Sequence, residues 1–96
     1  MAKYKLSNSA KEDLIRIHHF GVENFGMVQA YKYFNTFFDY FEIIAQRPYA
    51  FESVDYIRKG YRRCACGSDS IYYKISGEMI VEIMAIVGSQ DLSNIP

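Results

Sequence analysis

The hydrophobic pattern of this chain changes its period once, and that change limits the possible folds more than any other feature. Between residues 10 and 46, apolar side chains recur every three or four positions, which places them along one face of an α-helix. Between residues 61 and 87 they recur mainly at every second position, as in strands with one buried face. Helical segments followed by strands predict an α+β domain in which helices pack on a sheet.

The first helix is predicted to begin at Ala10, because Ser9 and Glu12 have the Ser-x-x-Glu spacing of a capping box. Gly26 is expected to end this helix, since glycine tolerates the left-handed backbone conformation found at many helix ends. The predicted buried stripe consists of Leu14, Ile17, Gly21 and Phe25.

A long second helix is predicted from Met27 to the Arg47-Pro48 pair, so that the two helices form a tight hairpin. Proline has no backbone N–H and the residue before it avoids the helical conformation, so the helix should stop there. Residues 49–56 lack a clear period and are expected to form a loop. The predicted buried stripe consists of Met27, Tyr31, Phe34, Phe38, Phe41 and Ala45, widened by Ala30, Phe37 and Ile44.

The remaining apolar runs alternate with polar residues and predict strands, one before the helices and three after them: residues 3–7, 61–66, 70–75 and 79–87. Turn-forming residues separate the last three strands, which should therefore form an antiparallel meander. The complete prediction is an α+β fold with a two-helix hairpin packed on one face of a small, mainly antiparallel β-sheet.

The length of 96 residues suits one domain, and we expect residues 1–96 to form it, with residues 88–96 as a short C-terminal tail. Eleven Lys and Arg balance eleven Asp and Glu, so the chain lacks the positive field that attracts nucleic acids, and no direct nucleic-acid partner is expected. Neither a signal-like segment nor an apolar run of ~20 residues is apparent, which predicts a cytoplasmic protein that does not span a membrane.

Side chains that could perform chemistry are few and poorly placed for it. His18 and His19 are adjacent, so on a helix their rings point about 100° apart and cannot share a metal ion. Cys64 and Cys66 form at most half of a zinc site and are expected to be buried structural residues. We therefore predict no catalytic residues, no metal site and no cofactor.

Four of the eleven basic residues lie within six positions, at Arg58, Lys59, Arg62 and Arg63. One interpretation is an edge strand whose charges discourage pairing with another chain. The other is a docking patch for an acidic or phosphate-bearing partner.

The last predicted strand is apolar on both faces. Because the two helices can cover only one face, the other should contact a partner or a second copy of the same chain. Strict alternation assigns Val81, Ile83, Ala85 and Val87 to the face under the helices, and Ile80, Met84 and Ile86, with Glu82, to the partner face.

Several segments, taken in order, resemble a known family. Residues 10–17 follow the pattern Ala-x-x-Asp-Leu-x-x-Ile, and residues 26–33 follow Gly-x-x-Gln-Ala-x-x-Tyr. Residues 57–63, then Gly67-Ser68, then residues 71–74 resemble the progression Arg-x-Gly-Tyr-Arg, Gly-Ser-His and Phe-Tyr-Arg. In this order the segments resemble the ParE branch of the RelE/ParE superfamily of bacterial type II toxins.

The resemblance implies a RelE/ParE-like fold and a toxin that inhibits DNA gyrase by binding it, without being an enzyme. It also implies a ParD-like antitoxin, whose C-terminal segment wraps the toxin in a hetero-oligomer. Together with the charge and hydrophobic patterns, it gives the candidate partner-binding residues Arg58, Tyr61, Arg62, Arg63, Tyr73, Ile80, Met84 and Ile86.

Two other functions stay open. The first is a ribosome-dependent mRNA endonuclease of the RelE type, in which Arg58, Arg62, Arg63 and Tyr73 would bind phosphate and handle protons. The second is an inactive module that only binds the antitoxin. Asp69 stands where histidine is common, and Ala85 and Gly88 stand where an Arg-Ile-Leu-His-like ending is usual, which disfavours RNA cleavage.

Overall fold

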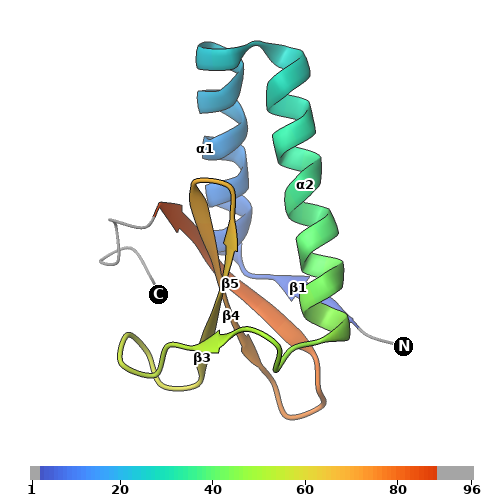
Figure 1. Cartoon of the computed structure of the whole chain (residues 1–96), viewed down its shortest axis with the longest axis vertical. Helices are drawn as coiled ribbons and strands as arrows, with labels where there is room; N and C mark the ends of the chain where they lie inside the picture. Colours follow the sequence, from blue (N-terminus) through green and yellow to red (C-terminus); the bar gives the residue numbers. More distant parts are fainter. Residues whose placement is uncertain (1–2, 89–96) are drawn as a thin grey trace.

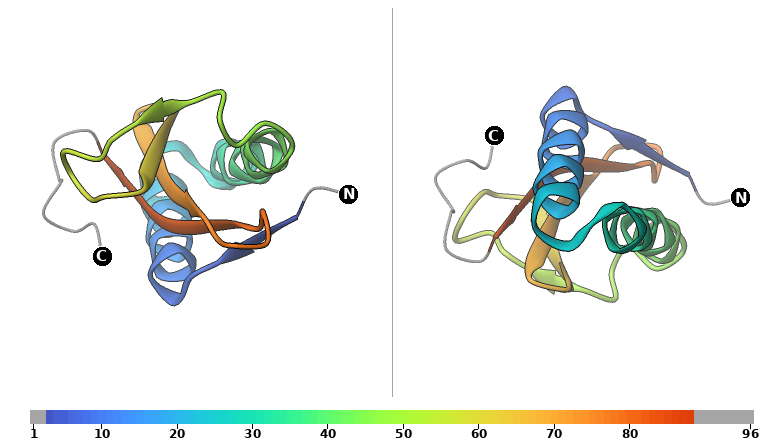
Figure 2. Two further views of the ribbon diagram at one scale, coloured as in Figure 1. Left: turned by 90° about the horizontal axis from the view of Figure 1, so that it is seen from below. Right: turned by 90° about the horizontal axis from the view of Figure 1, so that it is seen from above.

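The computed structural model describes residues 3–88, which form a helical hairpin and one sheet (Figure 1). Along the chain the elements are β1 (Tyr4–Leu6), α1 (Asn8–Phe25), α2 (Met27–Gln46), β2 (Glu52–Ser53), β3 (Tyr61–Cys66), β4 (Asp69–Ile75) and β5 (Val81–Gly88). The strand order is β1-β5-β4-β3-β2, with β1 parallel to β5 and the other neighbours antiparallel. The predicted α+β fold is confirmed, and Figure 2 shows α2 nearly end-on with α1 beside it, seen obliquely.

The segment predicted to be a loop, residues 49–56, contains the short edge strand β2. Glu52 pairs with Arg63 and Ser53 pairs with Arg62. A strand of two residues is too short to show a period, so the sequence pattern could not predict it.

The N-cap of α1 differs from the prediction. Ser7, and not Ser9, caps the helix, because its Oγ accepts a hydrogen bond from the Ala10 N–H at 3.0 Å. The same hydroxyl donates to the Met84 carbonyl at 3.0 Å, and the Ser7 N–H donates to the Ile83 carbonyl at 2.9 Å. Ser7 therefore joins β1 to α1 and fixes both to β5, which starts the helix two residues earlier than predicted.

The helical hairpin extends beyond the sheet, and its tip is exposed (Figure 1). Gly26 joins the helices with a φ of 86°, as the sequence predicts. Phe25, Met27 and Tyr31 are 67%, 68% and 60% exposed, so the prediction that they are buried is wrong. Helical spacing shows which side chains share a face, but it cannot show where the covering sheet ends. In the described part of the chain, neither helix is long and apolar enough to cross a membrane.

The main core lies between the hairpin and the sheet. Its buried members include Leu14 and Ile17 of α1, Phe37, Phe41 and Ile44 of α2, and Cys64, Cys66, Ile71, Tyr73, Val81, Ile83 and Ile86 of the sheet. A smaller cluster lies on the outer face, the face of the sheet opposite the helices: Val54, Tyr61, Tyr72, Ala85 and Val87 are buried there, with Ile57 and Met84 packed against them. The loop between β2 and β3 therefore covers part of the face that we predicted to need a partner.

A β-bulge interrupts the pairing of β4 with β5. Tyr72 pairs with Ala85, whereas the next residue, Tyr73, pairs with Ile83. Met84 therefore has no partner on β4, which is the two-against-one arrangement of a bulge.

The bulge reverses the alternation of side chains beyond Met84. Ile83 and Ile86 both belong to the core under the helices, while Ala85 and Val87 face outward. The predicted faces of Ile86, Ala85 and Val87 are therefore wrong. Strict alternation holds only for unbroken pairing, and one extra residue moves every later side chain to the opposite face.

Two predictions at the ends of β5 also change. Ile80 precedes the strand and is half-buried beside the end of α2, where it lines a cavity of about 440 Å³ together with Ala45 and Pro48. It is therefore not part of the strand's outer face. Gly88, predicted to begin the tail, is the last residue of β5, and residues 89–96 lie outside the described residues.

Candidate partner-binding surface

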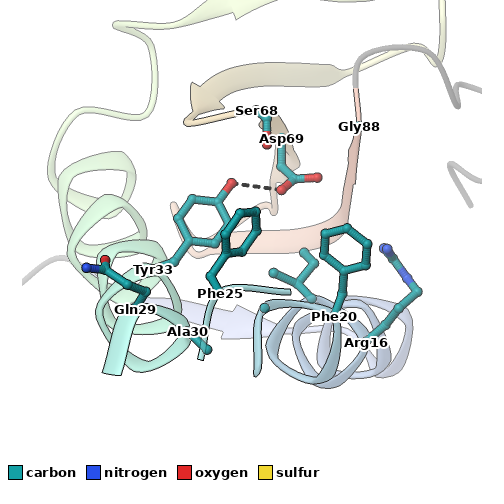
Figure 3. Close-up of a pocket in the computed structure, with 11 residues that line it drawn as sticks. Arg16, Phe20, Phe25, Gln29, Ala30, Tyr33, Ser68, Asp69 and Gly88 are labelled. Carbon is teal, nitrogen blue, oxygen red and sulfur yellow. Dashed lines mark hydrogen bonds between the residues drawn. The ribbon is translucent and has the colours of Figure 1, made fainter. Parts of the chain in front are cut away.

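A pocket of about 630 Å³ lies between the helical hairpin and one end of the sheet (Figure 3). Residues of α1 and α2, of the turn between β3 and β4 with the first residue of β4, and of the end of β5 form its walls. On its helical side α1 and α2 approach each other closely, because a Cβ added at Gly21 would lie only 3.1 Å from the Ala30 Cβ. None of these residues is among the predicted binding residues, since only the tertiary fold brings the four segments together.

Tyr33 connects α2 to the turn between β3 and β4. Its hydroxyl lies 2.8 Å from the Asp69 Oδ2 and 3.1 Å from the Cys66 carbonyl oxygen. Burial, followed by the hydrogen bond to Asp69, raises the pKa of Tyr33 to about 12, so the hydroxyl stays protonated and donates. Gly67 allows this contact, because a Cβ there would lie 2.7 Å from the Tyr33 ring and its φ is +61°.

Two side chains of α1 bind the exposed edge of β5 where β1 no longer covers it. The Ile86 N–H donates to the Asp13 Oδ2 at 2.9 Å, and the Ile86 carbonyl accepts from the Arg16 guanidinium at 3.2 Å. Arg16 and Asp13 also form a salt bridge at 3.4 Å. Two residues further along β5, Gly88 lines the pocket, and a Cβ added there would lie 4.0 Å from the Asp69 Oδ1.

Large apolar side chains are exposed around the pocket. Phe20 and Phe25 are 61% and 67% exposed, and their ring centroids lie 6.4 Å apart. Met27 and Val28, at the tip of the hairpin, are similarly exposed. Clustered exposed apolar side chains on a small protein mark an interaction surface.

The basic run does not form one patch. Arg62 lies on the helix side of β3, where it donates to the Phe51 carbonyl at 2.7 Å and lies 5.0 Å from the centre of the Tyr49 ring. Arg63 lies on the outer face, where it donates to the Ser70 hydroxyl and to Glu52, each at 2.9 Å. The hydrogen bond to Glu52 raises the pKa of Arg63. Both guanidinium groups are therefore bound within the chain.

The other predicted binding residues are divided between the two faces and differ in exposure. Tyr73 is buried on the helix side, where its hydroxyl donates to the Pro48 carbonyl at 2.7 Å and burial raises its pKa to about 12. Tyr61 is buried in the outer cluster, and burial raises its pKa also. Arg58 is exposed in the loop before β3, and Met84 is half-buried on the outer face. Their roles in partner binding remain predictions.

Cys64 and Cys66 are buried free thiols on the helix side of β3, as the sequence predicts. Burial raises the pKa of each to about 11, so both stay protonated and unreactive near neutral pH. Within residues 3–88, no group of three or more His, Cys, Asp and Glu side chains is arranged to hold a metal ion.

Comparison with known proteins agrees with the fold and with the sequence resemblance. Residues 4–92 match the family described as "ParE toxin of type II toxin-antitoxin system, parDE". Toxin ParE1 of Caulobacter vibrioides is 34% identical over 87 residues, which cover 91% of this chain and 88% of that protein. Toxin ParE1 of Mycobacterium tuberculosis is 27% identical over 86 residues, which cover 90% of this chain and 88% of that protein.

A solved structure has the same fold. It is described as "Chromosomal ParDE TA system from P. aeruginosa", superimposes with a TM-score of 0.80 at 19% identity, and covers 92% of this chain and 96% of that one. The family match across nearly the whole chain, together with the Caulobacter relative, shows that this chain belongs to the ParE toxin family of type II toxin-antitoxin systems.

Proposed function

We propose that this protein inhibits DNA gyrase by binding it, without catalysing a reaction, and that a ParD-like antitoxin neutralises it in a hetero-oligomer. The observation that carries the proposal is the family match over residues 4–92. The description of the solved relative, a ParDE system, supports an antitoxin partner. Since gyrase acts in the cytoplasm, the proposal includes a cytoplasmic location.

The exposed apolar tip of the hairpin supports a partner. Phe20, Phe25, Met27 and Val28 are each more than half exposed. Burying such a side chain fully is worth roughly 1.5–3 kcal/mol, so a segment lying along the tip would gain a large part of its binding free energy there. An amphipathic helix or an extended segment of an antitoxin has the shape to do this.

The arrangement of the basic residues supports inhibition without catalysis. A ribonuclease would need phosphate-binding and proton-transferring groups directed at one site. Arg62 and Arg63 instead point to opposite faces of β3 and are bound within the chain, and Tyr73 is buried. Asp69 also stands where histidine is common in the family, and Ala85 and Gly88 stand where an Arg-Ile-Leu-His-like ending is usual, so an arginine and a histidine that could serve RNA cleavage are missing.

Expression in bacteria tests the proposal. Induction of the protein alone should arrest growth, and co-expression of the neighbouring open reading frame, as the source of the antitoxin, should restore it. Primer extension on cellular mRNA after induction should show no new 5′ ends, because no message is cut. Codon-specific cuts would instead support the endonuclease, and unimpeded growth would support the inactive module.

A further inference from the structure

The pocket between the hairpin and the sheet combines aromatic walls with a carboxylate. Figure 3 shows the rings of Tyr33, Phe25 and Phe20 in a row beside Asp69. Tyr33 donates to one oxygen of Asp69, the Oδ2, at 2.8 Å. The hydroxyl carries no charge, so this hydrogen bond leaves the negative charge of Asp69 in place.

Among the charged side chains around the pocket, Asp69 differs from Arg16 and Asp13 because it has no ionic partner within the described residues. Arg16 also lines the pocket, but its guanidinium pairs with Asp13 at 3.4 Å and donates to the Ile86 carbonyl. Within residues 3–88, Asp69 forms no salt bridge. Asp13, Arg16 and Asp69 together carry a net charge of −1, and aromatic faces also attract cations.

From this combination we infer that the pocket binds a cationic side chain, arginine in preference to lysine, from the protein segment that docks on the hairpin. A planar guanidinium can stack on the Phe25 and Phe20 rings and still donate to the carboxylate of Asp69. The inference rests on the proposed function in one respect, that the segment belongs to the antitoxin.

The first test examines the pocket without the antitoxin. The purified protein is titrated with N-acetyl-arginine amide and followed by the NMR shifts of the Ser68, Asp69 and Gly88 amides. N-acetyl-citrulline amide, the neutral analogue of the same shape, is the matched ligand. We expect saturable shifts with the arginine compound and binding about tenfold weaker with the citrulline compound. Loss of a hydrogen bond between charged groups lowers the affinity by about this factor or more.

Asp69→Asn should weaken binding of the arginine compound about tenfold, since it removes the charge but keeps an oxygen that accepts from Tyr33. Asp39→Asn, the same change at an exposed position of α2, should have no effect. Phe25→Leu removes one ring and should weaken binding several-fold, and it serves as the test if Asp69→Asn does not fold. Equal binding of the two compounds, or no dependence on Asp69 and Phe25, would overturn the inference.

The second test examines the source of the side chain. In the complex with the antitoxin, Asp69→Asn should lower affinity about tenfold and reduce the salt dependence of binding, while Asp39→Asn should change neither. Wild-type affinity in the Asp69→Asn complex would overturn the inference about the antitoxin. If the wild-type protein formed no complex at all, the proposed function would fail instead, and the titration with N-acetyl-arginine amide would still decide the chemistry of the pocket.

Discussion

Tyr33 is the side chain on which the geometry of the pocket depends most. Its hydroxyl holds the turn between β3 and β4 through Asp69 and the Cys66 carbonyl. Its ring occupies the space that a side chain at position 67 would need. The turn, and with it the carboxylate of Asp69, is therefore fixed to α2, and two predictions at the scale of single residues follow from this contact.

Gly67→Ala should lower the free energy of unfolding by about 1–3 kcal/mol, because the new Cβ would meet the Tyr33 ring and the backbone has a positive φ. Gly77→Ala is the matched control, since a Cβ there meets nothing within 4 Å, and it should stay within about 0.5 kcal/mol of wild type. Urea unfolding measures both. Equal effects of the two substitutions would mean that the turn is not fixed by Tyr33.

Tyr33 should also make stability depend on pH in the alkaline range. Burial and the hydrogen bond to Asp69 raise its pKa from 10.0 to about 12, so the folded state favours the protonated hydroxyl. The resulting stabilisation is complete below pH 10 and is lost as the pH rises through 12. Tyr33→Phe lacks this ionisable hydroxyl, while Cys64, Cys66 and Tyr73 titrate in both proteins. The difference in free energy of unfolding between wild type and Tyr33→Phe should therefore shrink over this interval, and a constant difference would contradict the assignment.

At the scale of elements, β5 depends on different partners along its two edges. β4 pairs with one edge, and β1 pairs with the other only as far as Ile83. Beyond that point Asp13 and Arg16 of α1 bind the backbone of Ile86. The helix therefore takes the place of a neighbouring strand beyond the end of β1.

Asp13→Ala should lower the free energy of unfolding by about 1–3 kcal/mol, because the partly buried Ile86 N–H loses its acceptor. Glu12→Ala, one position earlier on the exposed side of α1, should stay within about 0.5 kcal/mol of wild type. Hydrogen exchange gives a local measurement, in which the Ile86 amide should exchange faster in Asp13→Ala. Unchanged protection of that amide would show that α1 does not hold the edge of β5.

The outer face of β5 gives a prediction about partner binding. Met84, the bulge residue, is half-buried there against the small outer cluster. Met84→Lys should lower affinity for the antitoxin by tenfold or more, since a lysine at the interface would bury an unpaired charge. Met79→Lys, at a position that is 56% exposed before the strand, is the control and should bind as wild type does. Full affinity in Met84→Lys would mean that the partner docks elsewhere.

The sequence predicts the elements well and the faces of β5 poorly, for identifiable reasons. The start of α2 at Met27 and its end before Pro48 follow from Gly26 and from proline chemistry, which act locally. The bulge at Met84 has no such local cause, and it moves Ile86 into the main core. The pocket could not be predicted either, because it needs four segments that only the folded chain brings together.

At the scale of the whole molecule, charges of opposite sign lie near opposite ends of β3. Arg58 lies before the strand begins, and Asp69 lies just after it ends. Six residues of strand separate these ends by roughly 20 Å at about 3.3 Å per residue. An antitoxin segment that spans both would need acidic residues near Arg58 and an arginine near Asp69, which would fix the direction in which it binds.

Inhibition of gyrase by binding is the central claim, and a supercoiling assay tests it most directly. The toxin, purified as its complex and then freed from the antitoxin, is titrated into gyrase acting on relaxed plasmid. Supercoiling should be lost as the toxin approaches the concentration of gyrase, because an inhibitor that binds acts stoichiometrically, and added antitoxin should restore it. Full supercoiling in the presence of a large molar excess of freshly freed toxin would contradict the claim.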